Sequence, residues 1–239
     1  MKAMILAAGL GTRMRPLTDH TPKPLLKAAG KPLIKYHIEG LVAAGINDIV
    51  VNTSWLGSQI TDYLGDGSKF GASITLSHEE SPLETAGGIA KALPFLISHK
   101  NDNEFFIVVN GDVWTDFSYL ELLDIASNID INPDKDTSTL AHLVMVDNPP
   151  QHPNGDFYLL DNRALSESES PNSERLTFSG ISLLNKKLFD TCDGAATPLA
   201  PLLREAIQTN QVTGHKASCT WMDIGTPERL SILEKHLQR

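Results

Sequence analysis

Cysteine and long apolar runs are both scarce in this sequence, and each scarcity excludes a class of protein. The chain has 2 cysteines, Cys192 and Cys219, too few for a disulfide framework. No Cys-x-x-Cys or Cys/His spacing indicates a zinc site. The apolar run at the N-terminus reaches only to Gly9, which is too short for a signal-peptide core or a membrane span. We therefore expect a cytoplasmic protein with no membrane partner.

Internal repeats are lacking as well. The chain contains no hexapeptide repeat, so we expect no C-terminal β-helix domain. Its 239 residues are 41% hydrophobic and 21% charged, an ordinary length and composition for a globular protein with a substantial core. We expect a single domain over residues 1–239.

Positive charge is scarce except near the N-terminus. The net charge is −9, but residues 1–40 hold seven lysines and arginines against only Asp19 and Glu39. The acidic remainder argues against non-specific binding of nucleic acid. The basic island instead suits a small anion with several charges, such as a nucleotide or a sugar phosphate.

The basic island surrounds a glycine-rich turn that follows a short apolar strand, residues 1–7. Gly9 and Gly11 allow a sharp turn whose backbone N–H groups can form an anion site, while Arg13 and Lys23 add positive charge. Prolines on both sides stiffen the segment that carries the lysine. The pattern lacks the third glycine of a dinucleotide fingerprint and the Gly-Lys-Ser/Thr of a P-loop. We predict a polyphosphate cradle, with a plain turn as the alternative.

Apolar periodicity predicts strands that alternate with helices, as in a three-layer α/β/α, Rossmann-like domain with a mostly parallel sheet. Further strands are expected over 48–52, 72–77, 104–109, 139–146 and 177–184, and residues 212–219 lead back towards Trp221. Helices are expected over 32–45, 54–64, 117–127, 199–207 and 228–237, and another that ends at Leu96. Residues 147–175 should form loops around one short strand.

Asn110-Gly111-Asp112 directly follows the most strand-like segment, residues 104–109. Ligands bind at the carboxyl ends of parallel strands, and a carboxylate together with phosphate oxygens can hold Mg²⁺. Turn chemistry explains the same string, because Asn, Gly and Asp are common in turns. From these residues alone, the two interpretations are equally good.

One longer pattern carries a family resemblance. Leu6-Ala7-Ala8-Gly9-Leu10-Gly11-Thr12-Arg13-Met14-Arg15-Pro16-Leu17-Thr18, followed by Thr21-Pro22-Lys23-Pro24, resembles the signature of the sugar-1-phosphate nucleotidyltransferases. The similarity extends over nearly the whole chain. It implies an enzyme whose partners are an NTP and a sugar 1-phosphate, with residues 1–127 as the nucleotide-binding half and 139–239 as the sugar-binding half.

The resemblance also implies site residues. Arg13, Lys23 and Asp112 would be catalytic, and Asp112 and Asp223 would bind Mg²⁺ as the cofactor. The expected nucleotide-binding residues are Ala8, Gly9, Gly11, Thr12, Arg13, Lys23, Glu79, Gly87 and Gly88. The expected sugar-phosphate-binding residues are Asn110, Gly155, Gly180 and Arg204. The family lysine that meets the sugar phosphate has no match here.

Three segments most resemble the members of this family that transfer a uridylyl group: residues 110–116, 176–181 and 221–226. They imply UTP and N-acetylmuramate 1-phosphate as substrates, in peptidoglycan recycling. The sugar's lactyl carboxylate requires a cation or amide donors, for which Arg175 and Arg204 are the candidates. Glu79 stands where uridylyl and thymidylyl relatives have glutamine, and its carboxylate only accepts hydrogen bonds. Guanylyl or thymidylyl transfer to a mannose-, heptose- or glucose-type 1-phosphate therefore stays open.

Two other function classes compete with nucleotidyl transfer. A glycosyltransferase would need a metal-binding Asp-x-Asp, which Asp112-Val113-Trp114 does not supply. A non-catalytic nucleotide-sugar sensor would have no need to retain Arg13, Lys23, Asp112 and Asp223 together. We expect a monomer or a small homo-oligomer.

Overall fold

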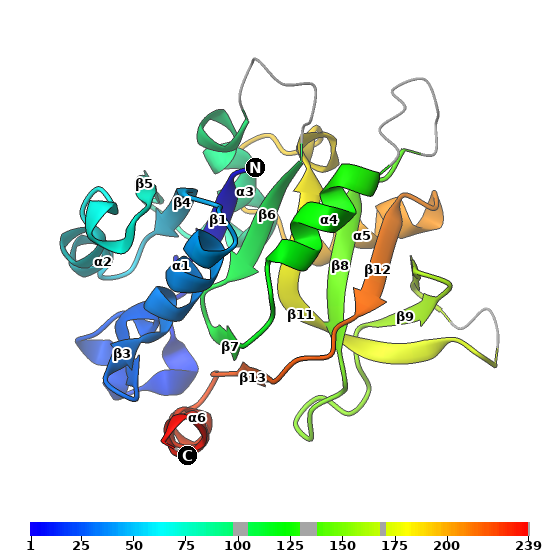
Figure 1. The fold of residues 1–239 in the computed structure, drawn as a ribbon. Helices are drawn as coiled ribbons and strands as arrows, with labels where there is room; N and C mark the ends of the chain where they lie inside the picture. The colour runs from blue at the N-terminus through cyan, green and yellow to red at the C-terminus, as the bar shows by residue number, and fades with distance from the viewer. Residues whose placement is uncertain (98–104, 130–137, 168–170, 239) are drawn as a thin grey trace.

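The computed structural model describes residues 1–97, 105–129, 138–167 and 171–238. Its centre is a nine-stranded sheet in the order β5-β4-β1-β6-β11-β8-β12-β10-β9 (Figure 1). The sheet strands are β1 (Ala3–Leu6), β4 (Asp48–Thr53), β5 (Ser73–His78), β6 (Phe105–Asn110), β8 (Ala141–Val146), β9 (Phe157–Leu160), β10 (Arg163–Leu165), β11 (Glu174–Asn185) and β12 (Val212–Lys216). The helices are α1 (Leu33–Ala43), α2 (Gly57–Leu64), α3 (Glu84–Leu96), α4 (Leu120–Asn128), α5 (Leu199–Gln208) and α6 (Pro227–Leu237). In the described ranges, no helix is long and apolar enough to cross a membrane.

The direction of strand pairing divides the sheet in two. From β5 to β6 every pairing is parallel, as expected from the alternation of strands and helices. From β6 onward the pairing is mixed: β11 is antiparallel to both of its neighbours β6 and β8, and β12 is parallel to β8. The sheet is therefore mostly parallel only in its first half, because β11 enters as a long antiparallel strand at its centre.

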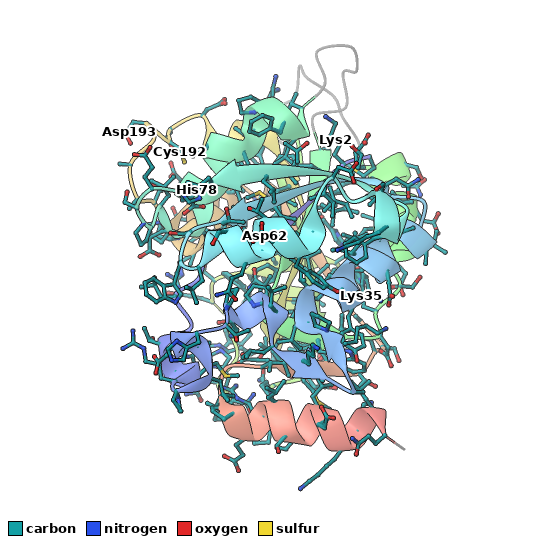
Figure 2. The ribbon with its side chains drawn as sticks, turned by 90° about the vertical axis from the view of Figure 1, so that its left-hand side faces the viewer. Lys2, Lys35, Asp62, His78, Cys192 and Asp193 are labelled. Carbon is teal, nitrogen blue, oxygen red and sulfur yellow. The ribbon has the colours of Figure 1, made fainter. Side chains whose placement is uncertain are left out.

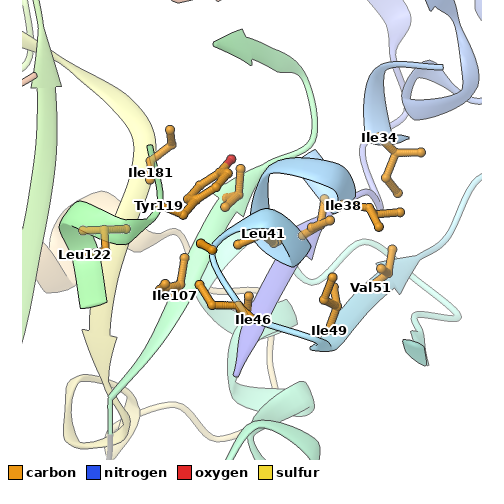
Figure 3. Packing of buried hydrophobic residues seen from close by; sticks show 14 of the residues in the cluster. Ile34, Ile38, Leu41, Ile46, Ile49, Val51, Ile107, Tyr119, Leu122 and Ile181 are labelled. Atoms are coloured by element: carbon orange, nitrogen blue, oxygen red, sulfur yellow. The ribbon is translucent and has the colours of Figure 1, made fainter. Parts of the chain in front are cut away.

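Helices cover both faces of the sheet, which confirms the three-layer fold. The pleat of β1 sends Ile5 toward the face covered by α1 and α4, and Met4 toward the face covered by α3 and α5. Seen from the β5 edge (Figure 2), α2 lies in front and α6 runs below the rest of the fold. On the first face, Ile38 and Leu41 of α1 pack against strand residues such as Ile49 (Figure 3).

A small antiparallel sheet lies beside the main one. It pairs β7 (Val113–Thr115) with β13 (Trp221–Asp223), placing Asp223 opposite Val113. Below it, α6 buries Leu233 against Trp114, in a cluster separate from the two main cores. The last helix thereby ties the C-terminal segment to the carboxyl end of β6.

Three segments differ from the sequence predictions. The helix expected at 117 begins at Leu120, because the Asp116 carboxylate accepts from the Thr220 N–H at 2.7 Å and does not cap the helix. The region expected to contain one short strand forms β9 and β10, with Asp161 and Asn162 at positive φ between them. The connector predicted over 128–138 lies largely outside the described residues.

Candidate active site

The turn after β1 is built to leave its backbone amides open. Gly11 has φ +62°, and a Cβ there would lie 2.9 Å from the Thr18 Cγ2, so that only glycine fits. A Cβ on Gly9 would meet nothing within 4 Å, which leaves the space beside it open. The Met14 N–H bonds back to Gly11, but no hydrogen bond is found for the N–H groups of residues 9–13 in the described structure. Such a run of free amides is an anion-binding concavity.

Lys23 reaches this concavity from a rigid segment. It begins a short 3₁₀ helix, Lys23–Leu25, between two prolines, and only 8% of the residue is exposed. Its Nζ donates to Asp112 Oδ2 at 2.8 Å. The structure therefore brings two of the predicted catalytic residues into direct contact, 89 positions apart in the sequence.

The two predicted metal ligands are joined through backbone. The Ile224 N–H donates to the Asp112 carbonyl at 2.9 Å, which continues the β7–β13 pairing. Asp112 and Asp223 consequently line the same pocket. Asp223 forms an ion pair with Arg229 in the first turn of α6. Sequence reasoning missed Arg229; the signal was a basic residue shortly after the Thr226-Pro227 helix start.

A cleft of about 440 Å³ opens at the carboxyl ends of β1, β4 and β6. Seven of the nine predicted nucleotide-binding residues line it: Ala8, Gly9, Gly11, Thr12, Arg13, Lys23 and Glu79. Asn110, Asp112 and Gly225 line it as well. The glycine turn, the buried lysine and the acidic group therefore face one space.

Gly87 and Gly88 do not line the cleft themselves, and their contact with a base stays a prediction. Both are buried inside α3. A Cβ on Gly87 would lie 2.6 Å from the Ala195 carbonyl oxygen, and one on Gly88 would lie 2.6 Å from Glu79 Oε1. Close packing of protein against protein explains these glycines.

Glu79 sits at the wall of the cleft in a hydrogen-bond chain with a fixed direction. Asn52 Oδ1 accepts from the Ala7 N–H at 2.7 Å, so its amide Nδ2 must face Glu79 Oε1, also at 2.7 Å. The other Glu79 oxygen accepts from the Leu83 N–H at 3.2 Å. Because both oxygens must accept, glutamate fits this position and glutamine would oppose one donor with another. Asn52, which sequence reasoning missed, orients the carboxylate and ties it to the turn after β1.

A second pocket of about 250 Å³ adjoins the cleft. The two share Arg13, Asn110 and Asp112 in their linings. The remainder of the second lining comes from the C-terminal half: Pro149, Gln151, His152, Asp156, Thr177, Phe178, Ser179, Trp221 and Asp223, with Val113 at the border. A group bound at the shared residues can reach both spaces.

Of the four predicted sugar-phosphate residues, only Asn110 lines the second pocket. Gly180 has φ +79° at a bulge of β11, and a Cβ there would lie 2.6 Å from Asn110 Nδ2. A Cβ on Gly155 would lie 2.6 Å from Asn148 Oδ1. Both glycines allow close packing around the pocket. Arg204 is exposed on α5 and lines neither space, so its role in binding the sugar phosphate stays a prediction without support from the pocket geometry.

His37 is a buried core residue. Its two ring nitrogens lie 3.0 Å from the Tyr119 hydroxyl and 2.8 Å from the Val113 carbonyl oxygen. Burial lowers the pKa of His37 to about 4, so the ring is neutral at pH 7.

These features are typical of an α/β enzyme that binds a nucleotide. They are a Rossmann-like sheet, a turn with free backbone amides, and a lysine–aspartate pair at the carboxyl ends of parallel strands. A sequence model described as "Nucleotidyl transferase" matches residues 2–239. The chain belongs to this nucleotidyl transferase family, and the resemblance found in its sequence is confirmed.

Relatives and neighbours agree with this assignment. The chain is 48% identical over 232 residues to N-acetylmuramate α-1-phosphate uridylyltransferase of Neisseria meningitidis serogroup B, covering 96% of this chain and 95% of that protein. It is 33% identical over 236 residues to mannose-1-phosphate guanyltransferase of Gibberella zeae, covering 95% of this chain and 62% of that protein. The crystal structure of HddC from Yersinia pseudotuberculosis matches with a TM-score of 0.77 at 24% identity, covering 99% of each chain. At that identity the likeness supports the fold alone.

Proposed function

We propose that this enzyme transfers a uridylyl group from UTP to N-acetylmuramate α-1-phosphate and releases pyrophosphate, in the cytoplasm, as a step of peptidoglycan recycling. The relative from Neisseria meningitidis, which bears that activity in its name, aligns over nearly the full length of both proteins. The observation that carries the reaction class is the pair of adjoining pockets with Arg13, Asn110 and Asp112 between them.

The two pockets suit a transfer between two substrates. The glycine turn, whose free amides can bind a triphosphate, lines only the larger space. The smaller space takes most of its lining from residues 149–223. We assign the nucleotide to the first and the sugar to the second, which divides the domain into the halves 1–127 and 139–239.

The nucleophile needs no general base. A phosphomonoester has a second pKa near 6 and is already ionised at neutral pH. The protein's task is to align the sugar phosphate with the α-phosphorus and to neutralise charge. Lys23 would stabilise the α-phosphate in the transition state, and Arg13, at the border of the two pockets, would stabilise the departing pyrophosphate.

The acidic pair fits Mg²⁺. Mg²⁺ binds to one or two carboxylates together with substrate phosphates, and seldom to a complete protein cage. Asp112 and Asp223 supply two neighbouring carboxylates, and the described residues contain no cluster of three or more metal-binding side chains. When bound, the ion would neutralise charge on the α-phosphate and the incoming phosphate. Lys23 forms an ion pair with Asp112, and Arg229 forms one with Asp223.

A guanylyltransferase is the second candidate, and Glu79 favours it. The buried carboxylate presents only acceptors to the cleft, and guanine carries several N–H donors on its edge. Uracil offers one N–H, which Glu79 can accept while backbone amides meet its carbonyl groups. The relative from Gibberella zeae is named a mannose-1-phosphate guanyltransferase, which supports the same alternative.

A substrate matrix tests both candidates. Each of four NTPs is combined with the 1-phosphates of N-acetylmuramate, N-acetylglucosamine, glucose and mannose, and pyrophosphate release is measured with and without Mg²⁺. We expect UTP with N-acetylmuramate 1-phosphate to give the highest kcat/KM. Highest activity with GTP and mannose 1-phosphate would replace this proposal by the second candidate. No pyrophosphate from any pair would refute both.

A further inference from the structure

The wall of the second pocket that is not shared with the nucleotide cleft carries a histidine–aspartate pair. His152 Nε2 lies 3.0 Å from Asp156 Oδ1, and both residues line the pocket. Arg13, a cation in this lining, also lines the nucleotide cleft. His152 is thus a side chain with a ring N–H donor that lies on the sugar side of this lining alone.

The pair is held by the loop that carries it. Asp156 Oδ2 accepts from the Phe178 N–H of β11 at 2.8 Å, and the Asp156 N–H donates to the Leu176 carbonyl at 2.8 Å. The His152 N–H donates to Pro149, which closes the loop. With Nε2 committed to Asp156, the other ring nitrogen, Nδ1, has no partner among the described residues and remains for a ligand.

Stability does not account for the pair. The side chains of His152 and Asp156 are 43% and 38% exposed, and ion pairs in that environment contribute little to folding. The hydrogen bond that Asp156 accepts from the Phe178 N–H would hold the loop without any histidine. Binding of a ligand in the pocket would account for the presence of the histidine.

We infer that His152, positioned by Asp156, recognises a carboxylate on the sugar of the sugar 1-phosphate, with the neighbouring Gln151 amide as a second donor. The inference rests on the proposed function. A protonated imidazole donates from both nitrogens, so Nε2–H can bond Asp156 while Nδ1–H bonds the sugar carboxylate. Neither of the arginines expected from the sequence lines the pocket, and Arg175 lies over the ring of Tyr158.

The test compares an acidic and a neutral sugar. In His152→Gln, kcat/KM for N-acetylmuramate 1-phosphate should fall by roughly 10- to 100-fold, as expected for loss of one charge-assisted hydrogen bond. The fall should come mainly from KM, since the contact is made equally in ground and transition states. Activity with N-acetylglucosamine 1-phosphate, measured with the same NTP, should change by less than about 2-fold. His20→Gln, an exposed histidine outside both pockets, is the matched control and should leave both sugars unaffected.

Calorimetric binding of the two sugar phosphates without NTP separates this inference from the proposed function. Tighter binding of the acidic sugar that disappears in His152→Gln supports recognition, even if the wild type transfers no uridylyl group to that sugar. Turnover of N-acetylmuramate 1-phosphate with an unchanged preference in His152→Gln overturns the inference and leaves the proposed reaction standing. Equal losses for both sugars in His152→Gln also overturn it.

Discussion

Asp112→Asn and Asp223→Asn test the proposed metal site most directly. If the two carboxylates share one Mg²⁺, each change should lower kcat by roughly 10²-fold or more, the usual loss for one charge-stabilising contact. The double variant should be little worse than either single variant, because groups that act as a unit are non-additive. Their backbone connection through Ile224 makes a shared ion geometrically reasonable.

The same change at Asp112 has a cost to stability that the structure allows us to estimate. Its partner Lys23 has a side chain only 9% exposed, while the Asp112 side chain is 42% exposed. Two unit charges 4 Å apart attract by about 4 kcal/mol at an effective dielectric constant of 20, and desolvation cancels much of this. Asparagine can still accept from the lysine, so we expect a loss of about 1–2 kcal/mol. For a chain of this length that lowers Tm by about 2–8 °C.

The assay follows pyrophosphate release together with thermal unfolding, with and without Mg²⁺ and UTP. Wild-type protein at a hundredfold excess of ligand over Kd should gain about 2.7 kcal/mol, and the two variants should gain much less. Asp62→Asn, an exposed aspartate on α2 at the β5 edge (Figure 2), is the control and should behave as the wild type. Near-wild-type turnover in either single variant would refute the shared-metal proposal, and an unchanged Tm for Asp112→Asn would refute the estimate for its ion pair.

Three further results should follow from the structure. Lys23→Ala should reduce kcat by about 10²-fold with little change in NTP affinity, whereas Arg13→Ala should weaken both; unchanged calorimetric affinity for NTP in Arg13→Ala would contradict this. Glu79→Gln should lower the free energy of unfolding by about 1–2 kcal/mol, because one of its two donors loses an acceptor, and a urea titration that shows no loss would oppose the assigned hydrogen-bond direction. Burial and the neighbouring His215 lower the pKa of His142 to about 4. His142 is therefore protonated at a higher pH in the unfolded chain than in the folded protein. Because the unfolded chain takes up this proton as pH falls below 6.5, the free energy of unfolding of the wild type should drop by about 2 kcal/mol between pH 7 and 5. His142→Gln should flatten that part of the urea-derived stability curve, and a slope equal to the wild type's would contradict it.

Local pattern was enough to predict much of the nucleotide side. The turn after β1 is defined by residues close in sequence, and Gly11 has the positive φ that its residue type allows. The start of α6 could be predicted for the same reason, since Thr226 accepts from the Arg229 N–H and Pro227 occupies the first helical position. Each of these features is determined by residues that lie within a few positions of one another.

The sugar side depends on contacts between distant segments, and the sequence alone did not predict most of the residues that line its pocket. Arg204 has the right charge for a phosphate, but the amphipathic pattern of α5 places it on the exposed face. On the nucleotide side, Gly88 has the right type for a close ligand approach, and its missing side chain also makes room for Glu79. The residue type shows which interactions a position can make. Only the packing of the folded chain shows which neighbour takes part in them.

Two ion pairs, Lys23–Asp112 and Arg229–Asp223, suit a site that acts through charge and without a general base. Asp112 and Asp223 line the same pocket, and unpaired carboxylates close to each other repel. Lys23 and Arg229 relieve that repulsion from separate elements, one from a proline-bounded turn and one from α6. In the proposed reaction Lys23 exchanges one anionic partner, Asp112, for another, the α-phosphate, so its charge is used without any proton transfer. The described histidines can then serve packing or sugar recognition, because the chemistry requires none of them to titrate.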